Sequence, residues 1–370
     1  MASELAVTIG DSAGLRRSQR IGLVLGPAVF LLLMLAPLPS GLSAQGQAVL
    51  ACTLWIAVWW ISEAIPIPVT ALLPIPLFPL TGALGLAETT ASYGHRYVFL
   101  YIGGFVLAIA IAKWNLHRRI ALTILSAVGT DLAMLVLGFM LATALMSMWI
   151  SNTATTVMML PIGMALVGQY VDGCDNADDH RFFGKALMLA IAWSASIGGT
   201  ATLIGTPPNL VLAGVVSELY GVQITFTQWF MFGFPLASAL LLICWLYLTR
   251  VAFPCRGSSF PGSHEQIAGL LRDLGPMKPE EKALLIVFVT TALLWISRAW
   301  LQKFLPALDD TIIAVASGIS LFLIPAGRPG ERLVTWDEAV KLPWGILLLF
   351  GGGIAIAGSF EDSGLALWIA

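Results

Sequence analysis

The stretch "MSMWISNTATTVMMLP", residues 146–161, places six Ser, Thr and Asn side chains in the middle of a run without charge. This uncharged run comprises 36 residues, from 132 to 167. Since a helix needs about 20 apolar residues to cross a bilayer, the run is too long for one ordinary span. It also leaves almost no room for a turn between two full spans. Any prediction of the fold has to explain this polar cluster.

The composition of the whole chain is that of a polytopic membrane protein. Of its 370 residues, 58% are hydrophobic and 11% are charged, and the mean hydropathy is +0.87. Soluble domains carry about 25% charged residues. The net charge of −2 gives no reason to expect nucleic acid as a partner. The four cysteines and four histidines lack the spacing of a metal site or a disulfide framework, so we expect no cofactor.

Nine further apolar runs are long enough, or nearly so, to span a bilayer. They cover residues 21–38, 47–62, 68–84, 97–112, 186–216, 226–248, 283–296, 311–325 and 343–360. The first run follows three arginines and could pass for a signal peptide. Its length exceeds the 7–15 residues typical of a signal's apolar core, so we predict a retained first helix.

The lysines and arginines indicate how residues 132–167 cross the membrane. If this run is a hairpin that enters and leaves on one side, 16 of the 19 basic residues face the cytoplasm. If it crosses once, only 8 of the 19 do so. The positive-inside bias prefers the hairpin, with a cytoplasmic N-terminus and a location in the inner cell membrane. The count alone leaves a re-entrant hairpin and two complete spans open, and the polar tip favours the re-entrant hairpin.

A tip at Ser151-Asn152-Thr153 would end midway through the bilayer. Non-helical backbone is tolerated there only where it is buried in protein or lines a watery cavity. Free N–H groups at a helix N-terminus attract anions, and hydroxyl and carbonyl oxygens can coordinate sodium. The alternative is that these side chains only bond to their own helix. Six of them close together, followed by Pro161, favour a binding site.

A second interruption lies at residues 194–209, "SASIGGTATLIGTPPN". Proline removes a backbone donor and pushes the preceding residue out of the helical region, yet apolar runs flank the segment. We therefore predict a span that is unwound at its centre, where Thr200, Thr202 and Thr206 expose hydroxyls and carbonyls. A plain proline kink is the alternative. Two interrupted helices that meet near the midplane are typical of the sites of secondary transporters.

Two short matches indicate an internal repeat. Residues 100–108, "LYIGGFVLA", match residues 349–357, "LFGGGIAIA". Residues 60–64, "WISEA", match residues 295–299, "WISRA". In the topology from the charge count the two copies run in opposite directions, which indicates the inverted-repeat plan of secondary transporters.

The repeat predicts the domain organisation. A cytoplasmic tail at 1–20 precedes the first helix and first repeat at 21–250, and a cytoplasmic linker at 251–282 leads to the start of the second repeat at 283–370. At the offset of the repeat, a second Ser-Asn-Thr hairpin is expected near position 400. We therefore expect the chain to be an N-terminal fragment that lacks this second hairpin.

Four motifs resemble the signatures of the divalent-anion/sodium symporters, a family of dicarboxylate and citrate carriers. They are "WWISEAIPIPVTALLPI" (59–75), "FLYIGGFVLAIAIAKWNLHRRIAL" (99–122), "SMWISNTATTVMMLPI" (147–162) and "IGGTATLIGTPPNLV" (197–211). The resemblance covers nearly the whole chain from Trp55 onward. It implies an all-α polytopic protein in the lipid bilayer, a homodimer whose transport domain moves like an elevator past a scaffold.

The resemblance also implies the roles of individual residues. Ser151, Asn152 and Thr153 would contact a carboxylate of the substrate. The first sodium site would be lined by Ser147, Ser151, Asn152 and Gly199. The residues that match the signature beside the site are Thr202, Gly205, Thr206, Pro207 and Asn209.

The expected function is sodium-coupled import of dicarboxylates such as succinate, malate or fumarate, with sodium as the coupling ion. Citrate transport, sulfate transport and dicarboxylate exchange are alternatives within the same fold, and a passive anion channel is another. An intramembrane enzyme would need a nucleophile with a base, or clustered metal ligands. Neither polar motif contains Asp, Glu, His or Lys, so we do not expect an enzyme.

Overall fold

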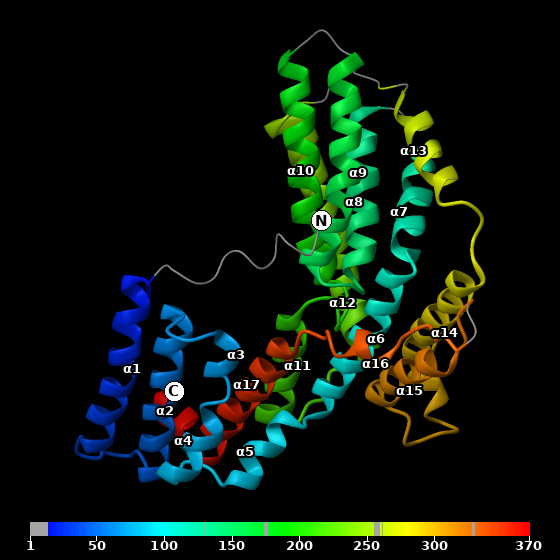
Figure 1. Ribbon diagram of the computed structural model, residues 1–370. Coiled ribbons are helices and arrows are strands. Elements are labelled where there is room, and N and C mark those ends of the chain that lie inside the picture. The colour runs from blue at the N-terminus through cyan, green and yellow to red at the C-terminus, as the bar shows by residue number, and fades with distance from the viewer. Residues whose placement is uncertain (1–13, 130, 174–176, 255–259, 261, 328–329) are drawn as a thin grey trace. The chain divides into compact units, whose positions relative to one another are not determined.

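The computed structural model describes residues 14–129, 131–173, 177–254, 260, 262–327 and 330–370 (Figure 1). Within these residues the chain forms helices joined by turns, without a strand, and one isolated antiparallel bridge joins Pro325 to Arg332. The prediction of an all-α fold is confirmed. Of the expected tail at 1–20, residues 1–13 lie outside the described residues, and the first helix already begins at Arg17.

The chain divides into two compact units that alternate along the sequence. Unit 1 consists of Met1–Val98, Gly214–Val222 and Pro343–Ala370, and unit 2 consists of Phe99–Ala213 and Gln223–Leu342. The divisions fall inside helices α6 (Arg96–Lys113) and α11 (Pro207–Tyr220). Each unit is described by itself.

Unit 1 is built around α17 and the helices that precede position 94. These are α1 (Arg17–Leu35), α2 (Ala44–Ser62), α3 (Ile67–Thr70), α4 (Pro74–Thr81), α5 (Leu86–Tyr93), α17 (Trp344–Asp362) and α18 (Leu365–Ile369). The predicted run at 68–84 is apolar and helical but is divided into two short helices, α3 and α4. Prolines at 66, 68, 74, 76 and 79 are the cause, since each removes a backbone donor that a continuous helix needs.

Unit 2 holds both interrupted segments. Its other helices are α7 (Leu116–Ser126), α8 (Leu132–Ser147), α9 (Asn152–Gly173), α10 (Ala177–Gly199), α12 (Phe226–Leu246), the π-helix η1 (Tyr247–Ala252), α13 (Gly262–Asp273), α14 (Pro279–Leu301), α15 (Asp310–Leu323) and α16 (Trp336–Ala339). The segment 251–282, expected as a linker, therefore contains a helix of its own, α13.

Seven helical segments of the described chain are long and apolar enough to cross a membrane, and they coincide with seven of the nine predicted runs. The remaining two runs fall on shorter apolar helices, at Ile67–Thr81 and Asp310–Leu323. A chain with this many apolar helices is a multi-pass membrane protein.

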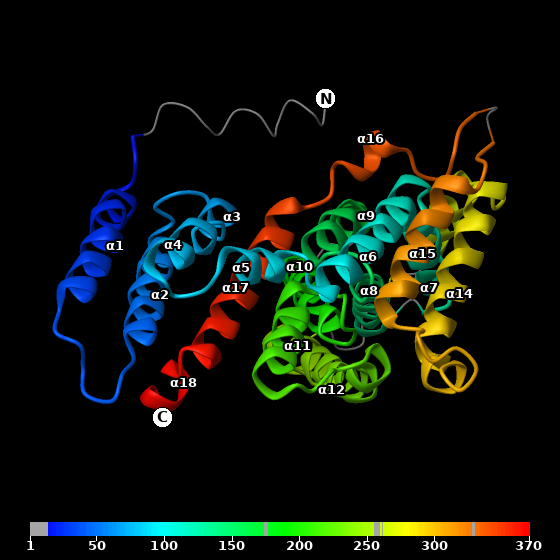
Figure 2. The same cartoon turned by 90° about the horizontal axis from the view of Figure 1, so that it is seen from below.

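Helices α8, α9 and α10 lie side by side in Figures 1 and 2 and share a core. The run at 132–167 is a helix, a short turn and a second helix, and the second helix continues to Gly173. Phe139, Leu166 and Ile191 are completely buried between the three helices. Gly198 of α10 lies so close to the backbone of Ala144 that a Cβ atom would clash with it. The three helices therefore form one tightly packed body.

The internal repeat has a structural counterpart. Helices α6 and α17 carry the matching motifs, and each is followed by a left-handed residue, Asn115 with a φ of 55° and Gly364 with a φ of 71°. The equivalent glycines also pack alike: Gly103 lies against the backbone of Ala314, and Gly352 lies against the backbone of Ala71.

Each glycine-rich helix packs on helices that are distant in the sequence. Helix α6 packs on α15 within unit 2. Helix α17 packs on α2, α3 and α5 within unit 1. Because of these contacts, the two units alternate along the chain.

Candidate functional site

The polar tip of the hairpin is a helix N-terminus. Helix α8 ends at Ser147, residues 148–151 form a turn, and α9 begins at Asn152. Ser151 caps α9, since its Oγ accepts from the N–H of Ala154 at 3.3 Å and its carbonyl from the N–H of Thr155 at 2.9 Å. The N–H groups of Asn152 and Thr153 lie in the first turn, where a helix supplies no backbone partner. Thr153 is exposed.

Three oxygen atoms meet beside this tip. The Oγ atom of Ser147, which is completely buried, lies 2.7 Å from Oδ1 of Asn152 and 2.6 Å from the carbonyl oxygen of Ala195 on α10. A serine hydroxyl has one proton, so it can satisfy only one of the two acceptors at a time. The group is therefore rich in unshared electron pairs and suits a small cation.

Gly199, the last residue of α10, completes this group. A Cβ atom at this position would clash with Oδ1 of Asn152. Glycine at this position lets the Asn152 side chain lie directly against the backbone of α10. The structure thus brings together Ser147, Asn152 and Gly199, with Ser151 on the same turn.

The second interruption lies directly after Gly199. Residues 200–206 are not α-helical, and Pro207 begins α11, a position where a missing N–H costs nothing. The buried Asn209 closes the segment, because its Nδ2 donates to the carbonyls of Gly199 at 2.9 Å and of Thr202 at 2.8 Å. Gly205 packs against the Gly199 carbonyl, where a Cβ atom would lie 2.5 Å from the oxygen.

The two interruptions touch one another. The hydroxyl of Thr202 is completely buried and donates to the carbonyl of Met148 in the turn at the hairpin tip. Thr206 is half-buried, and its carbonyl accepts from the N–H of Asn209 at 3.2 Å. Of the signature residues, Thr202, Gly205 and Asn209 thus hold the unwound backbone in place, and Thr206 and Pro207 begin α11.

Trp149, in the turn of the hairpin, makes aromatic contacts that the sequence did not predict. Its ring lies against Phe288 with centroids 4.7 Å apart, and is stacked with Phe226 at 6.0 Å and Trp295 at 6.1 Å. Phe226 and Trp295 are themselves stacked at 4.7 Å. We call these four residues the aromatic box. Trp149 precedes Ser151 by two residues, so the box holds the backbone turn on which the tip depends.

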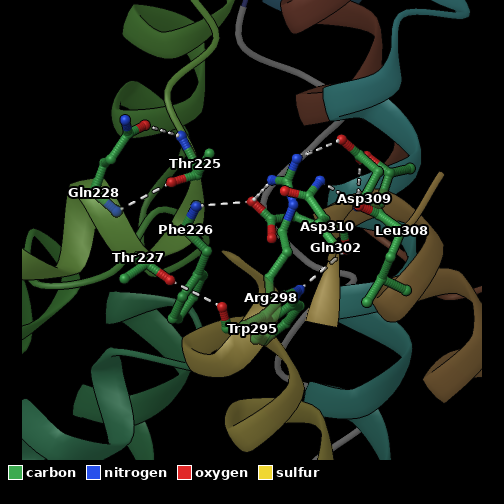
Figure 3. Close-up of polar contacts among 11 residues, drawn as sticks. Thr225, Phe226, Thr227, Gln228, Trp295, Arg298, Gln302, Leu308, Asp309 and Asp310 are labelled. Atoms are coloured by element: carbon green, nitrogen blue, oxygen red, sulfur yellow. Dashed lines mark hydrogen bonds and ion pairs between the residues drawn. The ribbon is translucent and has the colours of Figure 1, made fainter. Parts of the chain in front are cut away.

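A polar cluster fixes the aromatic box at the start of α12 (Figure 3). The carboxylate Oδ2 of Asp310 accepts from the N–H of Phe226 and from Nη1 of Arg298, both at 2.8 Å. The indole N–H of Trp295 donates to the carbonyl of Asp310 at 3.0 Å. Asp310 is 5% exposed, and a buried carboxylate needs such donors. In the sequence, Arg298 stands out only as part of the short match between residues 295–299 and residues 60–64.

Ion pairs within unit 2 anchor α6 and α7, the two helices that precede the hairpin. Lys113 lies 2.9 Å from Oε1 of Glu338, and Arg119 of α7 pairs with the buried Glu281 at 2.5 Å. Although burial raises the pKa of Glu338, the bonds from the N–H of Thr335 and from Lys113 bring this pKa below its usual value. Burial lowers the pKa of His117 on α7. These contacts fix the segment from which the hairpin starts.

The chemistry available at the tip is that of neutral oxygens and backbone N–H groups. None of Ser147, Ser151, Asn152, Thr153 and Gly199 carries a charge or a titratable group. Within the described residues no three His, Cys, Asp or Glu side chains could share a metal ion. Such a site can hold a hard monovalent cation and donate to an anion, and this arrangement in a multi-pass helical protein defines an ion-coupled secondary transporter.

Comparison with known proteins identifies the family. Residues 17–370 match the family described as "Sodium:sulfate symporter transmembrane region", and the chain belongs to this family. It is 44% identical over 359 residues to the "Sodium-dependent dicarboxylate transporter SdcS" of Staphylococcus saprophyticus, which covers 95% of this chain and 69% of that relative. The protein of the same name from Staphylococcus aureus is 45% identical over the same shares. The predicted family is therefore confirmed, and its members are transporters rather than enzymes.

Proposed function

We propose that the protein imports C4-dicarboxylate anions together with sodium ions. The single observation that carries this proposal is the contact of Ser147, Asn152 and Gly199 beside the N-terminus of α9. This contact supports the proposal, because oxygens that could coordinate a cation lie beside the first turn of α9, whose N–H groups could donate to an anion. The names of the two relatives, sodium-dependent dicarboxylate transporters, support the choice of both solutes.

The sodium ion would be held by oxygens from both interruptions. We assign to it Ser147, Ser151, Asn152 and the carbonyl of Gly199. Ser147 already has two acceptors for one proton, so a cation would relieve the crowding of lone pairs. Hard cations prefer such oxygen ligands. Asn209 would act indirectly, by fixing the direction of the Gly199 carbonyl.

The substrate carboxylate would bind at Ser151, Asn152 and Thr153. The N–H groups of the first turn of α9 and the partial positive charge of the helix end favour an anion there. A dianion on its own is unfavourable in a medium of low dielectric constant. A sodium ion bound one side chain away offsets that cost, which is the physical reason for coupling the two solutes.

Sulfate is the second candidate substrate, because the family description names it. Dicarboxylate is preferred because both relatives carry that name at 44% and 45% identity. Citrate, exchange without net sodium movement and a passive channel remain outcomes that the transport assay distinguishes.

We further propose the arrangement in the membrane. The basic residues favour a cytoplasmic N-terminus and a hairpin that opens to the cytoplasm without crossing the bilayer. We propose the inner cell membrane as the location and a homodimer as the working form. The first repeat at 21–250 and the second from 283 would form the inverted pair, joined by residues 251–282.

Uptake into proteoliposomes tests the proposal. We expect labelled succinate to accumulate when sodium is outside, and not when choline replaces sodium at equal ionic strength. Unlabelled malate should compete, and sulfate should compete only weakly. Counterflow with trapped unlabelled succinate should be observed for a carrier and not for a channel. Uptake that is equal in sodium and in choline would refute sodium coupling.

A further inference from the structure

Two threonines of the hairpin differ from the other buried threonines of unit 2. A helical threonine usually donates to the carbonyl four residues earlier. Thr249 does so to Trp245 at 2.7 Å, and Thr291 does so to Val287 at 2.7 Å. Thr143 of α8 and Thr155 of α9 are both 0% exposed, yet across the described chain neither hydroxyl has a hydrogen-bond partner. A buried polar group without a partner is unfavourable, so two of them need an explanation.

The two threonines lie at the same level of the hairpin. Ser147 contacts Asn152 across the turn, which fixes how the two arms pair. Thr143 precedes Ser147 by one helical turn, and Thr155 follows Asn152 by about one turn. Residues three or four apart share a face of a helix. Both threonines therefore lie about one helical turn from the oxygen group at the tip, on the side toward the open end of the hairpin.

The surroundings of this level restrict what it can bind. On the side away from the tip the core is apolar and buried, with Phe139 and Met140 on α8 and Met159 on α9. The hairpin itself carries no charged side chain between residues 132 and 167 that could attract an anion. Hydroxyl oxygens, with Ser147 one turn away, instead suit a small hard cation.

We infer that Thr143 and Thr155 form a second position for a sodium ion inside the hairpin, one helical turn from the proposed site at Ser147. The inference rests on the proposed sodium coupling. A position at this depth would let a sodium ion exchange one set of oxygen ligands for another within the hairpin. Ser147, with lone pairs facing two other oxygens, would serve both positions.

Thr143→Val and Thr155→Val test this inference, because valine has the shape of threonine and lacks the hydroxyl. The melting temperature of the protein in detergent is measured against sodium concentration, with choline keeping the ionic strength constant. Without sodium, each valine variant should melt at or above the temperature of the wild type, since an unpaired hydroxyl is removed. Its half-saturating sodium concentration should rise by about tenfold or more, because a ligand of the cation is lost.

Two controls separate ligand loss from a packing defect. Thr143→Ser and Thr155→Ser keep the hydroxyl and should keep the half-saturating sodium concentration within about threefold of the wild type, a change well below one tenfold step. Thr249→Val removes a buried hydroxyl of η1 that has a partner, because it donates to the carbonyl of Trp245 on α12. It should lower the melting temperature equally with and without sodium and leave the sodium dependence unchanged.

Three results would overturn the inference. Valine variants that are stabilised equally with and without sodium would show that the hydroxyls have no ligand. Valine variants that are destabilised equally in both conditions would indicate a structural water molecule instead. A wild type without any sodium-dependent stabilisation would refute the proposed sodium coupling, and the second position with it. In the first two results the wild type still responds to sodium, so the two failures are distinguishable.

Discussion

Asn209→Ala tests whether the unwound segment supports the sodium site through its backbone. The wild-type amide donates to the carbonyls of Gly199 and Thr202 at 2.9 Å and 2.8 Å, and its side chain is 6% exposed. Alanine leaves both buried carbonyls without this donor. Each loss costs about 1–3 kcal/mol, so the free energy of unfolding should fall by about 2–6 kcal/mol.

The Asn209→Ala substitution should also weaken sodium binding. Without Asn209 the Gly199 carbonyl is no longer held in a fixed direction, and a weakening of about 1.4 kcal/mol is already tenfold in affinity. We expect the half-saturating sodium concentration of uptake to rise by at least about tenfold. Gln45→Ala serves as the control, because it removes one bond of 2.9 Å to the carbonyl of Ala83 in unit 1.

Two assays on both variants show whether Asn209 supports sodium binding or only the fold. Melting curves in detergent report stability, and succinate uptake at graded sodium concentrations reports cation affinity. The Gln45 variant should lose stability and keep its sodium dependence. An Asn209 variant that melts lower but retains wild-type sodium affinity would show that the amide only supports the fold. Unchanged melting would contradict the two hydrogen bonds themselves.

Three further predictions follow from the site and its supports. Asn152→Ala should abolish sodium-dependent succinate uptake at normal expression, because alanine offers neither an oxygen to the cation nor an amide to the anion; wild-type uptake would refute the assignment. The pKa of Glu338 is lowered in the folded protein, so its contribution to stability is complete above the usual value of 4.5 and is lost as the pH falls through the folded value. Melting temperatures of the wild type and of Glu338→Gln should therefore converge on acidification, and a constant difference would contradict this. Cysteines at Gly129 and Gly168, positions where an added Cβ meets open space, should both react with an impermeant reagent from the cytoplasmic side, and reaction of either one only from outside would refute the hairpin topology.

Local properties of the chain explain what the sequence could determine. The absence of charge over 132–167, against a dense polar centre, predicted two helical arms around a turn, and the structure has that turn at residues 148–151. The double proline predicted an interruption, and residues 200–206 are unwound up to Pro207. A missing N–H and the cost of burying charge act at the residue itself. At 68–84 hydropathy suggested one continuous helix, and the prolines divide this segment into two short ones.

Only the tertiary structure decided which of these residues meet. Gly199 and Asn152 are 47 positions apart, and Trp149 lies 77 and 146 positions from Phe226 and Trp295, so their contacts depend on how each helix is rotated and shifted against its neighbours. The same holds for the packing of α6 on α15 and of α17 on α2, α3 and α5. It also holds for Thr143 and Thr155, since whether a buried hydroxyl has a partner depends on packing and not on its place in the sequence. Hydrophobic periodicity indicates which face of a helix is buried, but the partner of that face is chosen by the fit of side chains across the interface.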